Sequence, residues 1–591
     1  MADAQPRAEH PKPQFCRETW LNLNGTWNFA FDFGRSGEQR GWPDDPSGFD
    51  REITVPFCPE STLSGIGYTD FMPAVWYYRA VVIPADWAGK RVLLHFGAVD
   101  YHCKVWVNGQ LVGQHYGGSS SFAFDITDAL QDGENSLVVC ANDDTRSGVQ
   151  PKGKQCSQLF SRGCHYTRTT GIWQTVWLEA VPQSSIASVR VVPDLDSGRF
   201  ALTPVFQNAR RGQTFRAVLL DGDREVAGAQ MPASSGNGAA IRIEDPHPWH
   251  PSDPYLYGLR FELLEGDTVV DAVESYAGLR KFHIEGHRFF LNNEPIFLRL
   301  VLDQGFYPGG VWTAPSDGEL KADVERSMAV GFNGARLHQK VFEERFHYWA
   351  DRLGYLTWGE YCDWGMDFGQ PQAVHNQQRE WREIVLRDLN HPSIVAWTPY
   401  NETAGGARNH FEAHRRALEE TYELTRALDP SRPCHDVSGY VHVRTDIFTV
   451  HNYEQDPEKF AETYAGVSPD DPDNTPVRFP ELSAPYVGQP YVVDEYGGTW
   501  WKEGVSNEQD ADRKGSWGYG NRPRTIEEVY DRIEKLTAVL TNHPNIAGFT
   551  YTQLTDVEQE QNGIYTYERK LKFDADRLKK AFGAPAAIET H

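Results

Sequence analysis

The fold class is decided by residues 394–402, which read IVAWTPYNE. An apolar run of strand length leads there into the polar pair Asn401-Glu402, and the same design returns in YVVDE, which ends at Asp494-Glu495. A carboxylate that ends a buried strand is held rigidly at the rim of a sheet. Two such carboxylates that face each other are the minimum equipment for cleaving a glycosidic bond. The sequence therefore points to a hydrolase.

Strands alternate with helices throughout the part of the chain that contains both carboxylates. Amphipathic helices are predicted at residues 319–330, 377–389, 410–428 and 526–540. Eight strands are predicted, at residues 295–302, 332–337, 355–359, 394–398, 434–438, 447–451, 491–494 and 546–551. Eight such β/α units in about 300 residues match a TIM (β/α)8 barrel. We therefore expect the catalytic barrel to occupy residues 283–591.

The chain before the barrel has a different pattern. Short runs that alternate between apolar and polar residues are separated by tight-turn signals such as Asn108-Gly109 and Asp132-Gly133. This period of two predicts β-sandwiches. We expect a first sandwich at residues 1–182 and a second at 183–282, whose length of about 100 residues suits an immunoglobulin-like domain.

The composition narrows the choice of partner. A formal charge of −25 over 591 residues disfavours nucleic acid and anionic membranes, because phosphate groups would be repelled. The 18 tryptophans suit both packing and the stacking of sugar rings, so we expect a small-molecule or oligosaccharide substrate. No secretory signal or membrane-length apolar run is visible, which predicts a cytoplasmic protein. The eight cysteines lack zinc-type spacing and are expected to be reduced, so we predict neither metal nor cofactor.

Polar side chains occur at the end of every predicted barrel strand, where TIM-barrel active sites are assembled. In chain order they are Asp303, Arg336 with His338, Glu360 with Asp363, Asn401 with Glu402, His435 with Asp436, His451 with Tyr453, Glu495, and Gln553 with Asp556. A single instance is most simply a solvated loop residue. Polar residues at all eight strand ends favour an active site.

The whole chain from about residue 15 to 575 resembles glycoside hydrolase family 2. The most specific match is NHPSIVAW at residues 390–397, which is followed by Asn401-Glu402. Further agreement comes from LNGTW at 23–27, VWVNG at 105–109 and GIW at 171–173. The resemblance implies a sugar-binding-type jelly roll, an immunoglobulin-like sandwich and a catalytic TIM barrel. It also admits a homo-oligomer, since family members are often oligomeric.

The resemblance implies roles for particular residues. Glu402 corresponds to the general acid/base and Glu495 to the nucleophile of a retaining enzyme. Asn401 corresponds to the residue that binds the sugar 2-hydroxyl, Tyr453 to the hydroxyl donor of the nucleophile, and Arg336 to the arginine beside it. We expect burial and repulsion from Glu495 to raise the pKa of Glu402. The remaining candidate substrate-binding residues are His338, Asp303, His451, His165, Trp501 and Gln553; a structural role is an equal alternative for the histidines.

The chain departs from the family pattern at three places. Gln339 stands where β-galactosidases and β-glucuronidases have histidine. The family tryptophan of strand eight is missing, which leaves Tyr551, or a tryptophan at 500, 501 or 517, to stack on the sugar. The Asn-x-Lys motif with which β-glucuronidases bind the substrate carboxylate is replaced by Glu560-Gln561-Asn562, and a buried glutamate would repel a uronate.

These departures lead to a prediction about the substrate. A neutral terminal sugar is favoured, either a β-D-galactoside or the stereochemically equivalent α-L-arabinopyranoside. β-Glucuronidase or β-mannosidase activity and a non-catalytic carbohydrate-binding protein are the alternatives. A divalent ion near Glu402 and Glu360, as in some β-galactosidases, has no compact motif in the sequence, so none is predicted.

Overall fold

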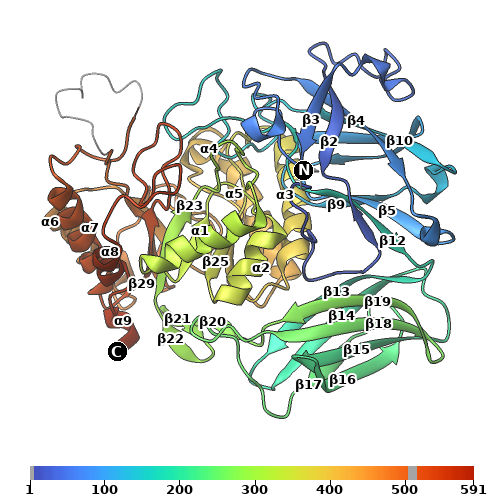
Figure 1. Cartoon of the computed structure of the whole chain (residues 1–591). Coiled ribbons are helices and arrows are strands. Elements are labelled where there is room, and N and C mark those ends of the chain that lie inside the picture. The colour runs from blue at the N-terminus through green and yellow to red at the C-terminus, as the bar shows by residue number, and fades with distance from the viewer. Residues whose placement is uncertain (1–4, 503–515, 591) are drawn as a thin grey trace.

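The computed structural model describes residues 5–502 and 516–590. Two β-sandwiches pack beside a larger α/β body that holds the C-terminal half of the chain (Figure 1). A buried cation joins the two sandwiches: Arg17 donates to Glu179 of the first at 3.0 Å and to Asp271 of the second at 2.9 Å. We propose that the first sandwich ends at residue 182 and the second at residue 282, as predicted from the sequence.

The first sandwich packs a six-stranded sheet, in the order β3-β2-β4-β10-β7-β8, against a four-stranded sheet, β1-β12-β5-β9. Side chains that alternate along these strands, among them Trp27, Leu94 and Val105, fill its core. Its strands are β1 (Trp20–Asn22), β2 (Gly25–Phe31), β3 (Arg51–Val55), β4 (Ala74–Val82), β5 (Arg91–Phe96), β6 (Val99–Asp100), β7 (His102–Val107), β8 (Gln110–Tyr116), β9 (Phe122–Asp125), β10 (Glu134–Asn142), β11 (Gly171–Ile172) and β12 (Val176–Val181).

The second sandwich packs sheet β13-β14-β17 against sheet β16-β15-β18-β19 around Phe215, Leu259 and Phe261. Its strands are β13 (Ser185–Asp194), β14 (Arg199–Gln207), β15 (Gln213–Asp221), β16 (Arg224–Pro232), β17 (Ala239–Arg242), β18 (Tyr257–Glu265) and β19 (Thr268–Ala277). A small antiparallel sheet leads from it into the barrel and consists of β20 (Phe282–Glu285), β21 (Arg288–Leu291) and β22 (Glu294–Ile296).

The barrel sheet has seven parallel strands in the order β26-β25-β24-β23-β29-β28-β27. The strands are β23 (Leu298–Asp303), β24 (Gly334–Leu337), β25 (Leu356–Glu360), β26 (Ile394–Thr398), β27 (Phe448–Asn452), β28 (Tyr491–Gly497) and β29 (Ile546–Thr552). The helices are α1 (Asp317–Ala329), α2 (Glu344–Leu353), α3 (Pro371–Asp388), α4 (Ala404–Asn409), α5 (Phe411–Leu428), α6 (Pro457–Tyr464), α7 (Ile526–Thr541), α8 (Ala575–Phe582) and α9 (Ala587–Thr590). The predicted β/α alternation is confirmed.

The predicted strand at 434–438 differs from the prediction. It forms no continuous strand: Cys434 bridges Trp397 of β26, and Ser438 bridges Asn401, which lies beyond the end of β26. Side chains connect it to β27 instead: His435 Nε2 lies 2.7 Å from the Thr449 hydroxyl. A side-chain contact stands here in place of backbone hydrogen bonds between strands. The seven-stranded sheet is therefore a curled half-barrel, and the irregular segment 434–438 lies where an eighth strand was predicted.

Two further predictions concern the cysteines, which were expected to be reduced, and the absence of a membrane-spanning segment. All eight thiols lie in the described part of the chain, six of them are buried, and none forms a disulfide. Within residues 5–502 and 516–590, no helix combines the length and the apolar character that crossing a bilayer requires.

Candidate active site

The two predicted carboxylates meet at the C-terminal ends of β26 and β28. One oxygen of Glu402, one oxygen of Glu495 and a ring nitrogen of His451 all lie within 4.8 Å of one another. Glu402 has a positive φ of 52°, and this left-handed turn after β26 is part of how the backbone brings its side chain to that position. Carboxyl groups about 5 Å apart suit an attack by one carboxylate while the other carries a proton.

Two donors hold Glu495. The Tyr453 hydroxyl donates to Oε2 at 2.5 Å, and Nη2 of Arg336 donates to Oε1 at 2.9 Å. Both partners are positioned by barrel strands, since Tyr453 follows β27 and Arg336 lies on β24. Hydrogen bonds to an ionised carboxylate stabilise its charged form and fix its orientation. Glu495 therefore has the surroundings of a nucleophile.

Arg336 organises the base of the site. Its side chain is fully buried; Nε donates to Glu360 at 2.6 Å and Nη2 donates to the side-chain oxygen of Asn401 at 2.9 Å. Burial alone would lower the pKa of Arg336, but Glu360 and Glu495 raise it above the usual range. The side-chain oxygen of Asn401 is thus occupied, whereas its amide nitrogen has no partner in the described part of the chain. A buried unpaired N–H is available for a sugar hydroxyl.

The environment of Glu402 differs from the prediction. Burial does tend to raise its pKa, but a 2.7 Å hydrogen bond from His451, the charge of that imidazolium and the charge of Lys154 together hold the pKa below its usual value. The prediction counted burial and Glu495 and overlooked these cations. The resting form is therefore a carboxylate paired with a protonated histidine.

His451 carries the proton of this pair. Its Nδ1 faces Glu402, and it lies 3.3 Å from Glu495; its Nε2 lies 3.3 Å from Asp494 and 2.9 Å from the Ser438 hydroxyl. Burial lowers its pKa, but Glu495 and Asp494 outweigh burial and raise the pKa to about 10. A protonated imidazole offers no lone pair to a metal, so this three-residue cluster fits a proton relay better than a cation site.

A loop of the first sandwich reaches the barrel and supplies polar groups to the site. We call residues 148–168 the insertion loop; the Lys152 amide donates to the Trp364 carbonyl at 2.8 Å, and the Tyr166 hydroxyl donates to Glu560 at 2.5 Å. Lys154 is buried with its ammonium 4.1 Å from the centre of the Trp364 ring. Burial opposes its charge, but Cys164, Glu560 and the two central glutamates raise its pKa. No ion pair with Lys154 occurs in the described ranges.

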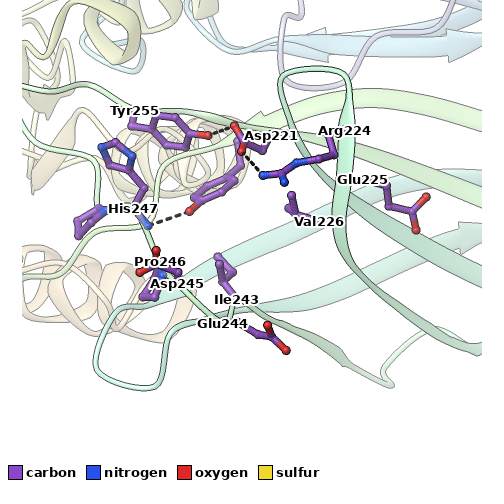
Figure 2. Close-up of a pocket in the computed structure, with 12 residues that line it drawn as sticks. Asp221, Arg224, Glu225, Val226, Ile243, Glu244, Asp245, Pro246, His247 and Tyr255 are labelled. Carbon is purple, nitrogen blue, oxygen red and sulfur yellow. Dashed lines mark hydrogen bonds and ion pairs between the residues drawn. The ribbon is translucent and has the colours of Figure 1, made fainter.

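A separate hollow of about 630 Å³ is lined by residues of the second sandwich (Figure 2). Its polar groups bind one another: Arg224 pairs with Asp221 at 2.9 Å, the Tyr255 hydroxyl also donates to Asp221, and His247 stacks on Tyr255 with ring centres 4.0 Å apart. Because these polar groups bind one another, few remain to bind a ligand in the hollow. The candidate active site is therefore assigned to the pair Glu402 and Glu495.

Comparison with known families matches all three parts of the chain. The sugar binding domain of glycosyl hydrolases family 2 matches residues 21–182, the family 2 domain matches residues 184–280, and the family 2 TIM barrel domain matches residues 360–583. The chain belongs to glycosyl hydrolase family 2. The fold class predicted from sequence is thereby confirmed.

The names of the relatives point to two classes of substrate. A beta-glucuronidase of Paenibacillus borealis is 25% identical over 72% of this chain and 73% of its own length. A beta-galactosidase of Thermoanaerobacter pseudethanolicus is 27% identical over 65% of this chain and 51% of its own length. A Formosa agariphila relative is 28% identical over 72% of this chain and likewise 51% of its own length. The match thus spans about half the length of two of these relatives.

Solved structures share the fold of this chain. A b-glucuronidase from Ruminococcus gnavus in complex with N1-substituted uronic isofagomine has a TM-score of 0.80 at 20% identity and covers 96% of this chain and 99% of its own. A Bifidobacterium dentium beta-glucuronidase complexed with coumarin-3-O-glucuronide has a TM-score of 0.77 at 22% identity. It covers 97% of this chain and 98% of its own.

Three other predicted residues lie around this centre. His338 receives a hydrogen bond from Arg336 at 2.6 Å, and burial with the charges of Lys154 and Arg336 keeps its pKa well below the usual value. Gln553 donates to Asn562 at 2.7 Å, and its own oxygen is unpartnered within the described residues. His165 lies on the insertion loop with its ring centre 5.4 Å from that of Trp364. Their contacts with substrate stay predictions.

Other predicted residues are placed elsewhere. Asp303 accepts from the Gly305 amide at 2.9 Å, and its carboxylate faces the charges of Asp323 and Arg569. Trp501 packs against the barrel core, and within the described ranges no contact joins it to either glutamate. Tyr551 is buried in that core and cannot serve as a sugar platform. The aromatic pair beside Glu495 is Tyr453 and Tyr519, whose rings stack with centres 3.4 Å apart.

Lys154 was missed by the sequence analysis. The rule that located the glutamates examines strand ends of one barrel, and Lys154 comes from a loop of another domain. The one available signal was the pair of lysines in PKGK at residues 151–154, which ends eleven residues before His165. Lysine pairs are common on surfaces, so this signal is weak.

Replacing His451 with glutamine is expected to shift the pH dependence of turnover. In the unmodified protein the histidine stays protonated until the pH rises through about 10, so the pair with Glu402 keeps a proton up to that pH. In His451→Gln the glutamate alone must hold the proton, and the alkaline limb of kcat/KM should move down by roughly two pH units or more. The buried His435 offers a matched control, since it contacts neither glutamate and His435→Gln should leave the limb in place. An unmoved limb in His451→Gln would contradict the relay.

Proposed function

We propose that this chain is a retaining exo-β-glycosidase that removes a terminal sugar by double displacement. The observation that carries the proposal is the separation of the Glu402 and Glu495 oxygens, which lie within 4.8 Å. That spacing leaves no room for a water molecule between the attacking carboxylate and the sugar, as inversion would need. The insertion loop supports exo action, because it brings side chains of a second domain against one side of the centre.

The geometry supports a two-step mechanism. Glu495 attacks the anomeric carbon as the bond to the departing oxygen breaks, and that oxygen takes a proton from Glu402. Glu402 receives this proton from His451, to which it is hydrogen-bonded at 2.7 Å. In the second step Glu402 accepts a proton from water, the hydroxide equivalent attacks the anomeric carbon, and the ester bond to Glu495 breaks. The sugar keeps its β configuration.

We place β-D-glucuronides first among the substrates. Lys154 is a buried cation that feels the charges of Glu560 and both central glutamates and forms no ion pair within the described residues. A substrate carboxylate would pair with it in a site of low dielectric. The Paenibacillus relative is named a beta-glucuronidase, and one solved Ruminococcus gnavus structure is in complex with D-glucuronic acid.

A neutral β-D-galactoside is the second candidate. In the sequence, Glu560 stands where β-glucuronidases need a lysine, and this favours a neutral sugar over a uronate. Its repulsion of a uronate is weaker than expected, because burial raises the pKa of Glu560 and Lys154 lies close enough to offset its charge. The Thermoanaerobacter relative carries the beta-galactosidase name.

A panel of p-nitrophenyl glycosides tests both candidates. We expect turnover of the β-D-glucuronide above that of the β-D-galactoside, α-L-arabinopyranoside and β-D-mannoside, with the β-anomer of the product appearing first in proton NMR. Faster turnover of the galactoside would reverse the order of the candidates. Release of the α-anomer first from a β-D-glycoside would reject retention, and no turnover of any member would favour a non-catalytic carbohydrate-binding protein.

Replacing Lys154 with methionine tests the sugar preference at one residue. If the ammonium pairs with a uronate, kcat/KM for the glucuronide should fall by roughly 30-fold or more, since a buried charge pair is lost. Methionine keeps the apolar stem that lies over Trp364, so neutral glycosides should be affected little. Lys154→Arg preserves the charge and serves as the control. Equal losses on charged and neutral substrates would indicate a structural role instead.

A further inference from the structure

Two arginines converge on one aromatic ring near Glu402. Arg408 lies on α4, which begins two residues after Glu402, and Arg478 lies on the irregular segment between α6 and β28. Their guanidinium carbons are 4.7 Å and 5.5 Å from the centre of the Phe479 ring. Arg478 also lies 5.5 Å from the ring centre of Tyr440. We call Arg408, Arg478, Phe479 and Tyr440 the arginine cluster.

The charges of the arginine cluster are not neutralised. In the described part of the chain neither arginine forms an ion pair or a hydrogen bond, although the protein has 82 acidic residues against 57 basic ones. Two cations held on one ring repel each other weakly through water, and an anion bound between them would gain from both.

The arginine cluster is connected to the catalytic acid. The Tyr440 ring is 5.4 Å from the His451 ring and 5.4 Å from the Phe479 ring. The Tyr440 hydroxyl is close enough to Glu402 to help lower the pKa of that carboxyl. Because Glu402 must protonate the departing oxygen, the leaving part of the substrate has to lie on the side of the site where Glu402 is reached. Tyr440 and Phe479 line that side.

We propose that Arg408, Arg478 and the ring of Phe479 form an aglycone subsite for a group that carries a carboxylate or a sulfate ester. The inference rests on the proposed glycosidase function and adds a preference about the leaving part of the substrate. The Phe479 face provides a platform for a sugar or aromatic ring, and the two guanidinium groups provide fork-shaped donors for a planar or tetrahedral anion. The sugar that is cleaved is recognised separately, by residues around Glu495.

Matched coumarin glycosides test this subsite. The sugar is the best one in the p-nitrophenyl panel, and the aglycone is 4-methylumbelliferone or its analogues with a carboxymethyl or a sulfate-bearing methyl group at the same carbon. The two charged aglycones distinguish a carboxylate from a sulfate preference. We expect kcat/KM to be about threefold to tenfold higher for an anionic aglycone than for the neutral one, as solvent-accessible charge pairs allow. High salt should reduce this ratio.

The double substitution Arg408→Gln with Arg478→Gln should bring the ratio to one or below while turnover of the neutral substrate is kept. Arg415 on α5 is the matched control, because its guanidinium lies 5.6 Å from the Phe411 ring, and among residues 5–502 and 516–590 no ring contact connects Phe411 to Glu402. Arg415→Gln should leave the ratio unchanged. A wild-type ratio of one or less, or a ratio that the double substitution does not alter, would overturn the subsite. If the unmodified protein failed to cleave the neutral substrate, the glycosidase function itself would be rejected.

Discussion

Glu495→Ala is expected to abolish turnover, with a loss of roughly 10⁴-fold or more in kcat, because the covalent step has no other nucleophile. The cavity left by the carboxylate should admit a small anion. Added azide should therefore restore product formation and yield a glycosyl azide of inverted, α configuration, which NMR can identify. That product reports the face of the sugar on which Glu495 lies.

The fold should tolerate this change. Arg336 loses one partner but keeps its 2.6 Å ion pair with Glu360, so its charge remains compensated. Circular dichroism and the thermal midpoint of the variant should stay close to those of the unmodified protein. Glu481→Ala, on the segment between α6 and β28, is a control that should retain full activity. Ordinary turnover by Glu495→Ala would show that the nucleophile has been assigned to the wrong residue.

Glu402→Gln is expected to separate substrates by their leaving groups. For an alkyl or sugar leaving group, which must be protonated, kcat/KM should fall by roughly 10²- to 10⁴-fold. For a 2,4-dinitrophenyl glycoside, which leaves without a proton, kcat/KM should stay near the unmodified value. The second step still needs a base, so the glycosyl-enzyme should accumulate and give a burst of dinitrophenol in stopped-flow measurements.

The amide of Glu402→Gln keeps an oxygen that can accept from His451, so the local arrangement is preserved. Intact-mass spectrometry during the burst should show the protein plus one sugar unit. Glu412→Gln, which removes an exposed carboxylate from α5, is the control for the loss of one negative charge. A uniform loss on all leaving groups would mean that Glu402 acts in binding and has no part in proton transfer.

The position of the two glutamates could be predicted because it follows from a local rule. A buried run such as that of β28 must be a strand, parallel strands expose their carboxyl ends at one rim, and a polar residue there has one place to go. The same rule placed Arg336, Asn401 and Tyr453 near Glu495. The rule says less about Asp303, whose carboxylate faces Asp323 and Arg569, because a side chain at a strand end can also turn toward a neighbouring helix.

The protonation of the site could not be predicted, because it depends on distances across the barrel. Burial of Glu402 was predictable from its strand, and by itself burial would raise the pKa of the acid. The opposite direction results from His451 on β27 and Lys154 on the insertion loop, which are far from Glu402 in sequence. Likewise, the sequence of 434–438 has strand character, but the side chain of His435 takes the place of a ladder on its open edge.

The candidate site is built by two domains, because the insertion loop of the first sandwich contacts the barrel beside it. Its backbone pairs with the barrel at Trp364 and Cys362, and Tyr166 buries its hydroxyl against Glu560. A fragment that begins at β23 would leave Glu560 without that partner and would lack Lys154 altogether. The proposed pairing of Lys154 with a uronate implies that exchanging the N-terminal part among related proteins would change the preferred sugar, although both glutamates stay in the barrel.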